Sequence, residues 1–388
     1  MRVAQFDMAS PDFPVSVVER DDPKLPRSDW ARVEITRAGI CGSDLHTIFG
    51  GHPSSSMYGP YVGFPPEMGH EIAGRVIETG PDCAVPVGTI VAVDPTLGCA
   101  TRGFPLCRNC AVGAPSACEK YTDGGLLAAG FGVGFTTGLG AGWGDQMVAH
   151  ESQLHVAPLG LTDPNAIVLA EPLSISVHGI LRRAPQHGEP VLIIGAGIIG
   201  LAAVASVRDL CPDSTVIVLA RHAHQATLAT QLGAHHVVTE RGDKAIMEAL
   251  AAITGAKVVG RKSGAQLVGG IYYTYEAVGT GESIDQALRY TSSRGVIIQA
   301  GVSGRSDIDL GPLYFKELTM IGTLCHCVDS DPTGHEIHSF DRALNIISAG
   351  GFPSSSLVTH EFALDDFANA CRTAHDKASG AVKVVLRP

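Results

Sequence analysis

Two short clusters near the beginning of the chain carry side chains that can bind a catalytic metal ion. The first, Gly39–His46, contains Cys41, and the second is the tripeptide Gly69-His70-Glu71. A catalytic zinc ion takes three protein ligands, drawn from thiolate, imidazole and carboxylate groups, and keeps a fourth position for water or substrate. Cys41, His70 and a carboxylate supply this set, although clusters this short also occur in ordinary loops.

Four cysteines further along the chain have the spacing of a closed zinc site. Cys107-Arg108-Asn109-Cys110 is a Cys-x-x-Cys pair, which can present two thiolates to one tetrahedral ion. Together with the flanking cysteines it predicts a structural zinc site at Cys99, Cys107, Cys110 and Cys118. Four unrelated buried thiols are the alternative interpretation. The ten cysteines of this long chain do not suggest a disulfide framework.

A glycine-rich turn in the middle of the chain is typical of a dinucleotide site. The segment Gly195–Gly200 (GAGIIG) follows an apolar strand, Val191–Ile194, and opens an apolar helix. In this context the glycines allow a tight turn and the close approach of a pyrophosphate, to which the helix N-terminus donates amide hydrogens. The residues expected to contact the cofactor here are Gly195, Gly197, Ile198, Ile199 and Gly200.

The end of the next strand indicates which dinucleotide is bound. NAD-binding proteins carry an acidic residue there that holds the ribose 2′-hydroxyl. This chain has Ala220-Arg221-His222 after the strand Thr215–Leu219. Arg221 can pair with a 2′-phosphate, and such a charge-assisted bond contributes about 1.5–3 kcal/mol. The sequence therefore favours NADP(H) over NAD(H), the alternative being an exposed arginine without a ligand.

The elements around these motifs change character near Leu161. Before it, period-two strands such as Val33–Thr36 and Ile72–Glu78 are separated by glycine and proline turns, which indicates a β-rich barrel or sandwich-like unit. After it, strands and helices alternate to about residue 301, which predicts a doubly wound sheet. Glu171 lies in an apolar stretch, where it is either a helix N-terminal charge or a carboxylate directed at the metal.

Composition argues against several functional classes. The chain has 388 residues, 45% of them hydrophobic and 17% charged, which is typical of a globular protein with room for two domains. A net charge of −11, without a basic run, argues against nucleic-acid binding. The first residues lack a secretory signal pattern, and no apolar run approaches the length of about 18 residues that a membrane span needs. We therefore expect a soluble, cytoplasmic protein without a membrane partner.

In their order along the chain, these motifs resemble those of the zinc-dependent medium-chain alcohol dehydrogenases, and most closely the polyol, threonine and glucose dehydrogenase branch. The segments that carry the resemblance are Gly39–His46, Gly69–Glu71, the four cysteines, Glu171-Pro172-Leu173 and Gly195–Gly200. The resemblance implies an α/β protein in which a chaperonin-10-like, β-rich catalytic domain (1–160 and 326–388) flanks a Rossmann domain with a doubly wound parallel sheet (161–325). It also implies a homodimer or homotetramer in which Leu318–Leu324 pairs with the partner.

The same resemblance assigns roles to individual residues. Cys41, His70 and either Glu71 or Glu171 would bind the catalytic zinc. Ser43 matches the hydroxyl that passes on the alcohol proton, and His46 matches the far end of that relay. The remaining cofactor contacts are expected from Arg221, His222, Val278, Gly279, Gly301 and Val302.

Two segments depart from the family pattern. Phe104 occupies the place of the first cysteine of the usual four-cysteine site, so Cys99 would have to substitute for it through a longer loop. The loop Gly50–Pro66, between the two catalytic clusters, is also longer than usual. Substrate specificity therefore cannot be transferred from the family.

The function expected from the resemblance is hydride transfer between NADP(H) and a small alcohol or carbonyl compound, of secondary or polyol type, with zinc as the Lewis acid. One alternative is a zinc-free quinone or enoyl reductase of the same fold, against which Cys41, His70 and the four cysteines argue. The other is a non-catalytic NADPH-binding protein.

Overall fold

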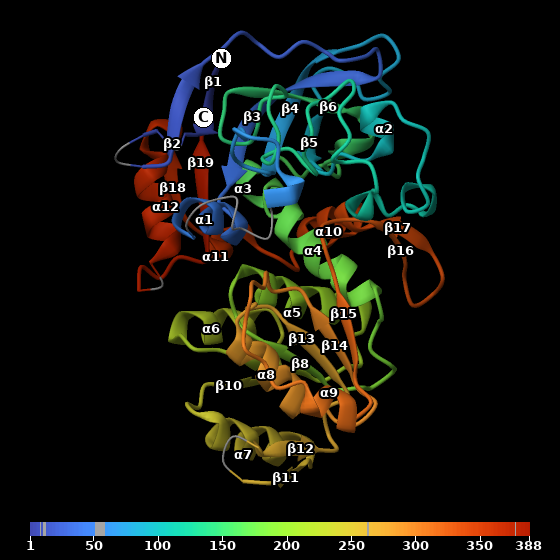
Figure 1. Cartoon of the computed structure of the whole chain (residues 1–388), viewed down its shortest axis with the longest axis vertical. Helices are drawn as coiled ribbons and strands as arrows, with labels where there is room; N and C mark the ends of the chain where they lie inside the picture. The colour runs from blue at the N-terminus through green and yellow to red at the C-terminus, as the bar shows by residue number, and fades with distance from the viewer. Residues whose placement is uncertain (8, 11–12, 51–58, 262–263, 377) are drawn as a thin grey trace. The chain divides into compact units, whose positions relative to one another are not determined.

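The chain forms two compact units that are not continuous in sequence. Both ends of the chain belong to unit 1, and Figure 1 shows strands from the amino-terminal end (blue) and from the carboxy-terminal end (red) in this unit. Unit 1 comprises Met1–Ser174, Cys325–Val328 and Ile337–Pro388, and unit 2 comprises Ile175–Leu324 and Asp329–Glu336. The computed structural model describes residues 1–7, 9–10, 13–50, 59–261, 264–376 and 378–388.

Unit 1 is built on a seven-stranded sheet. Its strands are β3 (Trp30–Gly39), β4 (Glu71–Thr79), β5 (Ile90–Val93), β6 (Gln146–His150), β7 (Leu154–Val156), β18 (Val358–Ala363) and β19 (Lys383–Arg387). The order is β18–β19–β3–β4–β5–β7, with β6 also paired to β3. Only β18 and β19 run parallel; the other described pairs are antiparallel. The predicted β-rich unit is thus completed by strands from the far end of the chain.

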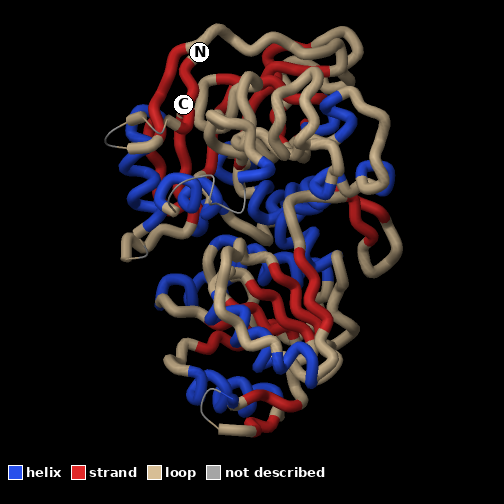
Figure 2. Tube along the Cα trace, in the orientation of Figure 1, coloured by secondary structure: helices blue, strands red, loops and turns tan. Residues whose placement is uncertain are grey.

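The remaining elements of unit 1 are short. A separate antiparallel pair is formed by β1 (Arg2–Phe6) and β2 (Val15–Glu19). The helices are α1 (Gly42–Phe49), α2 (Cys99–Arg102), α3 (Pro164–Ile167), α10 (Ser339–Ser348), α11 (Ser354–Leu357) and α12 (Phe367–His375), with single 3₁₀ turns at 59–61, 110–112, 115–117, 151–153 and 364–366. Most of the stretch between β5 and β6 is loop, drawn in tan in Figure 2. The predicted long loop Gly50–Pro66 falls largely on residues 51–58, which lie outside the described residues.

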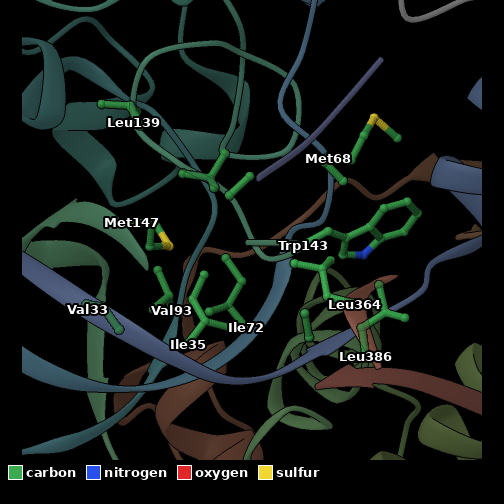
Figure 3. Close-up of a cluster of buried hydrophobic side chains, with 14 of the residues drawn as sticks. Val33, Ile35, Met68, Ile72, Val93, Leu139, Trp143, Met147, Leu364 and Leu386 are labelled. Atoms are coloured by element: carbon green, nitrogen blue, oxygen red, sulfur yellow. The ribbon is translucent and has the colours of Figure 1, made fainter. Parts of the chain in front are cut away.

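The core of unit 1 packs side chains from both ends of the chain together. In Figure 3, Val33 of β3 belongs to the same buried cluster as Leu386 of β19. Trp143, also in this cluster and fully buried, donates its indole N–H to the backbone carbonyl oxygen of Gly39 at 3.1 Å. This bond holds the end of β3, directly before the first predicted metal-binding cluster.

Unit 2 contains a six-stranded parallel sheet. Its strands are β8 (Val191–Ile194), β9 (Val216–Leu219), β10 (His236–Val238), β13 (Tyr273–Glu276), β14 (Val296–Gln299) and β15 (Thr319–Gly322). The order β10–β9–β8–β13–β14–β15 reverses direction between β8 and β13, which defines a doubly wound Rossmann sheet. All four residues of β8 are buried, as expected for a central parallel strand with both faces covered. The predicted α/β class is confirmed.

Helices connect the strands of unit 2, and two hairpins complete the described elements. The helices are α5 (Ile198–Leu210), α6 (Ala223–Gln231), α7 (Asp243–Thr254), α8 (Gly281–Tyr290) and α9 (Gly311–Phe315), and α4 (Ala170–Leu181) leads into the unit from unit 1. The two-stranded sheets are formed by β11 (Lys257–Val259) with β12 (Gln266–Val268), and by β16 (Val328–Ser330) with β17 (Glu336–His338), of which Val328, Ile337 and His338 belong to unit 1. None of the described helices combines the length and the apolar character needed to cross a bilayer.

Candidate functional site

The register of two strands brings the first two predicted metal-binding clusters together. β3 and β4 are antiparallel, with Gly39 opposite Glu71. β3 ends at Gly39, two residues before Cys41, and β4 begins at Glu71, directly after His70. The pairing of Gly39 with Glu71 therefore brings the segments that carry Cys41 and His70 to the same end of the strand pair. Cys41 is also the N-cap residue of α1, and its backbone N–H donates to Asp44 Oδ2 at 2.9 Å.

His70 is buried beside polar groups of α1. Its Nε2 is 3.4 Å from Ser43 Oγ, and its Nδ1 is 3.4 Å from Asp44 Oδ1. Neither His70 Nδ1 nor Asp44 Oδ1 has a hydrogen-bond partner among the described residues. Burial lowers the pKa of His70, but the charges of Asp44 and Cys41 outweigh burial and raise the pKa well above its usual value. A cation is therefore favoured here, whether a proton or a metal ion.

The relay residues lie on the same short helix. Ser43 is buried beside His70, whereas His46, three residues further along α1, is exposed. Residues three apart on a helix share a face, so the two side chains lead from the buried surroundings of His70 towards solvent.

Glu71 is engaged by a lysine from the other end of the chain. Lys383 Nζ lies 2.5 and 2.6 Å from the two carboxylate oxygens of Glu71, and it also donates to the carbonyl oxygen of Ile40 at 3.1 Å. Both side chains are at most 2% exposed. Burial raises the pKa of Glu71, Lys383 opposes this effect, and the nearby Glu171 adds to it, so that the pKa ends above its usual value. A second buried carboxylate therefore lies close to the Glu71–Lys383 pair.

Glu171 is the carboxylate in question, and its neighbour is His326. The carboxylate oxygen Oε1 lies 3.3 Å from His326 Nε2, while His326 Nδ1 is 2.7 Å from Ser174 Oγ. Ser174 in turn donates to the carbonyl oxygen of Glu171 at 2.7 Å. All three side chains are buried. The adjacent Cys325 has a φ of +54°, and its pKa is raised by burial and then by Glu171.

The spacing of possible metal ligands differs between the predicted sites. Among the described residues, two groups of three or more His, Cys, Asp or Glu side chains have ligand atoms within 4.8 Å of one another. One consists of Asp94, His155 and His338, and the other of the four predicted cysteines. Cys41, His70 and the two glutamates belong to neither group. In this arrangement Lys383 binds Glu71 and His326 faces Glu171. The thiol, imidazole and carboxylate groups of the predicted catalytic site are of the types that bind zinc. Their ligand atoms lie further apart than those of the two groups above.

The four cysteines of the predicted structural zinc site lie close together. Their sulfur atoms lie within 4.8 Å of one another, and Cys99 Sγ is 3.6 Å from Cys118 Sγ. A zinc ion bonded to four sulfurs at about 2.3 Å holds them about 3.8 Å apart, which this arrangement nearly matches. Phe104 packs against the cluster, and Cys99, at the start of α2, supplies the sulfur.

The thiols of this cluster differ in acidity. Burial would raise the pKa of Cys107, but the backbone amides of Glu119 and Cys110 outweigh it and lower the pKa to about 6. Burial raises the pKa of Cys118 to about 11. A divalent cation bound by the four cysteines would stabilise the thiolate form of each of them, because thiols bind metal ions in their deprotonated form.

In unit 2, the glycines of the predicted cofactor turn are required by close approaches. Gly195 has a φ of +98°, and a Cβ on Gly200 would lie 1.9 Å from the carbonyl oxygen of Gly195. Gly197, the N-cap of α5, has open space where a Cβ would lie, and Ile198 and Ile199 form the first turn of the helix. The helix N-terminus is thus open to an anionic ligand.

The other predicted cofactor segments are joined by a carboxylate that the sequence reasoning missed. Glu276, the fully buried last residue of β13, accepts the backbone N–H groups of Val278 and Gly279, both at 2.9 Å. A Cβ on Gly301 would lie 2.2 Å from Gly279 N, so the two glycines let these segments touch. Val278 and Val302 remain 42% and 38% exposed, which leaves apolar surface available to a ligand.

A pair of arginines lies at the carboxyl ends of β9 and β10. Arg221 donates to Glu282 at 2.9 Å, and both side chains are more than 60% exposed. Arg241, which the sequence reasoning did not single out, donates to the carbonyl oxygen of Arg221. His222 is the N-cap residue of α6, and its ring stacks on that of His224.

Three other residues near the predicted ligands were missed, and each had a partial signal. Asp44 lies in the first cluster itself, and His326 is part of the Cys325-His326-Cys327 run. Lys383 is a charged residue at the start of an apolar strand. In each case a charged or polar group in an apolar context indicated that a partner was needed, but not which partner.

Two family models match the chain. The alcohol dehydrogenase GroES-like domain matches residues 27–159, and the zinc-binding dehydrogenase matches residues 199–349. Together they span well over half of the sequence.

Similar proteins cover nearly the whole chain. An uncharacterized zinc-type alcohol dehydrogenase-like protein of Haemophilus influenzae is 28% identical over 359 residues, 89% of this chain and 88% of that protein. The (R,R)-butanediol dehydrogenase of Saccharomyces cerevisiae is 25% identical over 384 residues, 94% of this chain and 93% of that enzyme. The structure of a zinc-binding dehydrogenase from Sinorhizobium meliloti, solved with bound NADP, has a TM-score of 0.75 and is 24% identical; the match covers 100% of this chain and 99% of that chain. The matched models and these full-length similarities agree that the chain belongs to the zinc-dependent medium-chain alcohol dehydrogenase family.

Proposed function

We propose that this protein is a zinc-dependent oxidoreductase that transfers hydride between NADP(H) and a secondary or polyol-type alcohol and its carbonyl counterpart. The observation that carries the proposal is the buried position of His70, 3.4 Å from Ser43 Oγ, beside Cys41 and close to two carboxylates. The family assignment supports an alcohol oxidoreductase. In this proposal residues 1–160 and 326–388 form the catalytic domain, to which the start of α4 contributes Glu171, and the rest of 161–325 binds the cofactor.

Zinc bound at this site would supply Lewis acidity towards the substrate oxygen. Cys41 and His70 would provide the thiolate and the imidazole. We assign the third ligand to Glu171, because both oxygens of Glu71 are already bound to Lys383. In this assignment the Glu71–Lys383 pair orients the end of β3, and His326 orients Glu171.

The protein's own groups would move the proton. A bound nicotinamide cofactor would supply the hydride acceptor for alcohol oxidation, and the hydroxyl proton would have to leave the buried surroundings of His70. Ser43 Oγ would accept that proton and pass its own towards the exposed His46, one turn further along α1.

The first experiment compares Cys41→Ser with Cys83→Ser, a half-buried thiol outside the predicted metal sites. Each purified variant is assayed for zinc per chain, for NADPH binding by fluorescence, and for turnover of a panel of secondary alcohols, polyols and ketones with both cofactors. We expect Cys41→Ser to lose one zinc and all turnover while it still binds NADPH, and Cys83→Ser to behave as wild type. Normal turnover by a zinc-depleted Cys41→Ser protein would exclude this mechanism in favour of a zinc-free reductase. Cofactor binding by the wild type without any turnover would favour the non-catalytic alternative.

The third ligand is tested by comparing Glu171→Gln with Glu71→Gln. If Glu171 is the ligand, Glu171→Gln loses the catalytic zinc at a chelator concentration at which Glu71→Gln keeps it. The reverse order would assign the ligand to Glu71.

The cofactor preference rests on Arg221 and Arg241, which put two positive charges at the end of β9. Glu282 competes for Arg221. We therefore expect Arg221→Ala to weaken NADPH binding by about 10- to 150-fold, the equivalent of one charge-assisted bond, and to leave NADH almost unchanged. Glu282→Gln should have the opposite effect and tighten NADPH. Equal losses for the two cofactors in Arg221→Ala would contradict a phosphate-binding role.

We also propose that the chain forms a homodimer, or a tetramer built from it, through β15. This strand is the last of the described sheet, and Tyr314 and Phe315 before it are 80% and 83% exposed. An unpaired edge beside exposed aromatic side chains is suited to pairing with a second copy. Light scattering after gel filtration tests this: Met320→Pro, which removes an edge N–H, should yield monomers.

A further inference from the structure

A second group of possible metal ligands in unit 1 lies outside both predicted zinc sites. It consists of Asp94, His155 and His338, whose ligand atoms lie within 4.8 Å of one another. Asp94 follows β5 and His155 is in β7, where it pairs with Ala92. Because residues two apart on a strand share a face, Asp94 and His155 present their side chains to the same side of the sheet. His338 reaches them from the N-cap of α10.

Among the described residues, the hydrogen bonds around His155 engage only one of its two ring nitrogens. His155 Nδ1 lies 2.8 Å from Asp341 Oδ1, so the neutral ring carries its proton on Nδ1 and has a lone pair on Nε2. His155 is 8% exposed, and its Nε2 has no hydrogen-bond partner within the described part of the chain. A buried acceptor left unpaired is costly, so this nitrogen calls for a ligand.

The other two members face the same position. Asp94, 3% exposed, uses Oδ1 to accept the N–H of Thr96 at 2.7 Å, and its Oδ2 lies 3.6 Å from His338 Nε2. The rings of His155 and His338 are 4.4 Å apart between centroids. Phe340 stacks on the ring of His155 and provides an apolar wall.

We infer that Asp94, His155 and His338 form a third metal site, which binds a divalent transition ion such as Zn²⁺. Two imidazoles and one carboxylate are a donor set that suits zinc and related ions. The Asp341 carboxylate behind His155 is the arrangement that usually fixes the tautomer of a metal-bound histidine. One ion bonded to each donor at about 2.1 Å would draw the three atoms to about 3.4 Å from one another, a contraction that side-chain rotation can supply.

Binding has one identifiable cost. His338 Nδ1 accepts the backbone N–H of Phe340 at 3.3 Å, and ligation through Nε2 would place the proton on Nδ1 and break that bond. In return the ion would join three distant segments of unit 1. Ser339, the next residue, donates its backbone N–H to the carbonyl oxygen of Cys327 at 3.0 Å. The site would thereby also hold the segment that presents His326 to Glu171.

The test compares the zinc bound per chain in the wild type and in two matched variants. His155→Gln removes the free Nε2, and His150→Gln is the control, because His150 is equally buried but has partners on both ring nitrogens, Ser152 at 2.8 Å and Asp29 at 3.2 Å. Full-length proteins are stripped with a chelator, saturated with Zn²⁺ and analysed by mass spectrometry. We expect His155→Gln to bind one zinc fewer per chain than both the wild type and His150→Gln.

A Co²⁺ spectrum identifies which site has been lost. The cysteine-containing sites produce thiolate-to-cobalt charge-transfer bands, whereas a site of two histidines and an aspartate produces none. The difference spectrum between wild type and His155→Gln should therefore show ligand-field bands alone. If His155→Gln does not fold, His338→Asn serves the same comparison, because asparagine can still cap α10. Equal metal content in the wild type and the folded variant would overturn the inference, as would a difference spectrum with thiolate bands. Neither result depends on the catalytic zinc assignment.

Discussion

Replacement of Lys383 by methionine would leave the buried carboxylate of Glu71 without its ammonium partner. The two carboxylate oxygens lie 2.5 and 2.6 Å from Lys383 Nζ, and both side chains are at most 2% exposed. Methionine fills a similar volume, so the variant mainly removes the charge and its hydrogen bonds. We expect the free energy of unfolding of unit 1 to fall by about 3–5 kcal/mol, the usual cost of breaking a buried ion pair by removing one partner.

The cost of protonating Glu71 gives a similar estimate for the loss of stability in Lys383→Met. Without Lys383, Glu71 would take up a proton, and protonating a carboxyl of ordinary pKa at pH 7 costs about 3.7 kcal/mol. The loss should shrink as the pH falls towards about 4.3, where the unfolded chain also becomes protonated at this residue. In a unit of this size the loss corresponds to a decrease in Tm of roughly 6–20 °C.

Tryptophan fluorescence is a suitable assay. The chain has two tryptophans, Trp30 and Trp143, and both are fully buried in the core of unit 1. Urea unfolding is followed for the wild type, for Lys383→Met, for the exposed control Lys24→Met and for the double variant Glu71→Gln/Lys383→Met. The control should change stability by less than about 0.5 kcal/mol.

The double variant separates a missing charge partner from general damage. Removing both members of a buried pair is often neutral, or even stabilising by about 1–4 kcal/mol. We therefore expect the double variant to regain most of the stability that Lys383→Met loses. A loss below about 1 kcal/mol in Lys383→Met, or a double variant as unstable as the single one, would refute this reasoning.

Three further predictions concern other parts of the molecule. Cys107→Ser should lose one zinc per chain and lower the Tm of unit 1 while leaving NADPH binding intact; unchanged zinc content would argue against a four-sulfur site. Asp243→Asn should destabilise unit 2 by about 1 kcal/mol at pH 7: bonds to Tyr290 and Arg289 lower the pKa of Asp243 against the effect of burial, but the side chain is 37% exposed and solvent screening reduces their contribution. Because the unfolded carboxyl protonates first, that contribution begins to fall near pH about 4 and is lost completely only below the lowered pKa of the folded state, so acid denaturation curves of variant and wild type should converge as the pH falls through this range. Gly200→Ala should lower the free energy of unfolding of unit 2 by about 1–3 kcal/mol, because the new Cβ would overlap the carbonyl oxygen of Gly195. Gly197→Ala should leave that stability unchanged and weaken NADPH binding. Thermal melts and cofactor titrations of both variants distinguish these effects.

The features that could be predicted from the sequence are those determined by local pattern. The glycine turn after β8 was recognisable because turn, strand and helix are adjacent in the chain. The four cysteines could be assigned to one site because a Cys-x-x-Cys pair limits how its two thiols can point. Cys41 and His70 were assigned from two clusters about 30 residues apart, and the antiparallel register of β3 and β4 brings those clusters to the same level.

The partners of the buried charges could not be predicted, because they depend on pairings between distant strands. Lys383 reaches Glu71 only because β19 adds to the sheet beside β3, and no local pattern gives that order. His326 lies in a Cys-His-Cys run, but its contact with Glu171 depends on how the chain returns to unit 1 after residue 324. His155 gave no signal at all, since a lone histidine in a strand has no visible partner.

The pairing of Glu71 with Lys383 has a consequence for the order in which the protein is made. The two residues are 312 positions apart, so at a synthesis rate of about 5–20 residues per second the carboxylate emerges roughly 15–60 s before its counterion. During that time β3 and β4 can pair, but the strand that neutralises the buried charge does not yet exist. The nascent amino-terminal segment must therefore keep Glu71 hydrated or protonated, and we expect the surroundings of Glu71 and His70 to close late in folding. A ribosome-bound chain stopped before residue 383 should be far more sensitive to protease in β3 and β4 than a chain extended past residue 388.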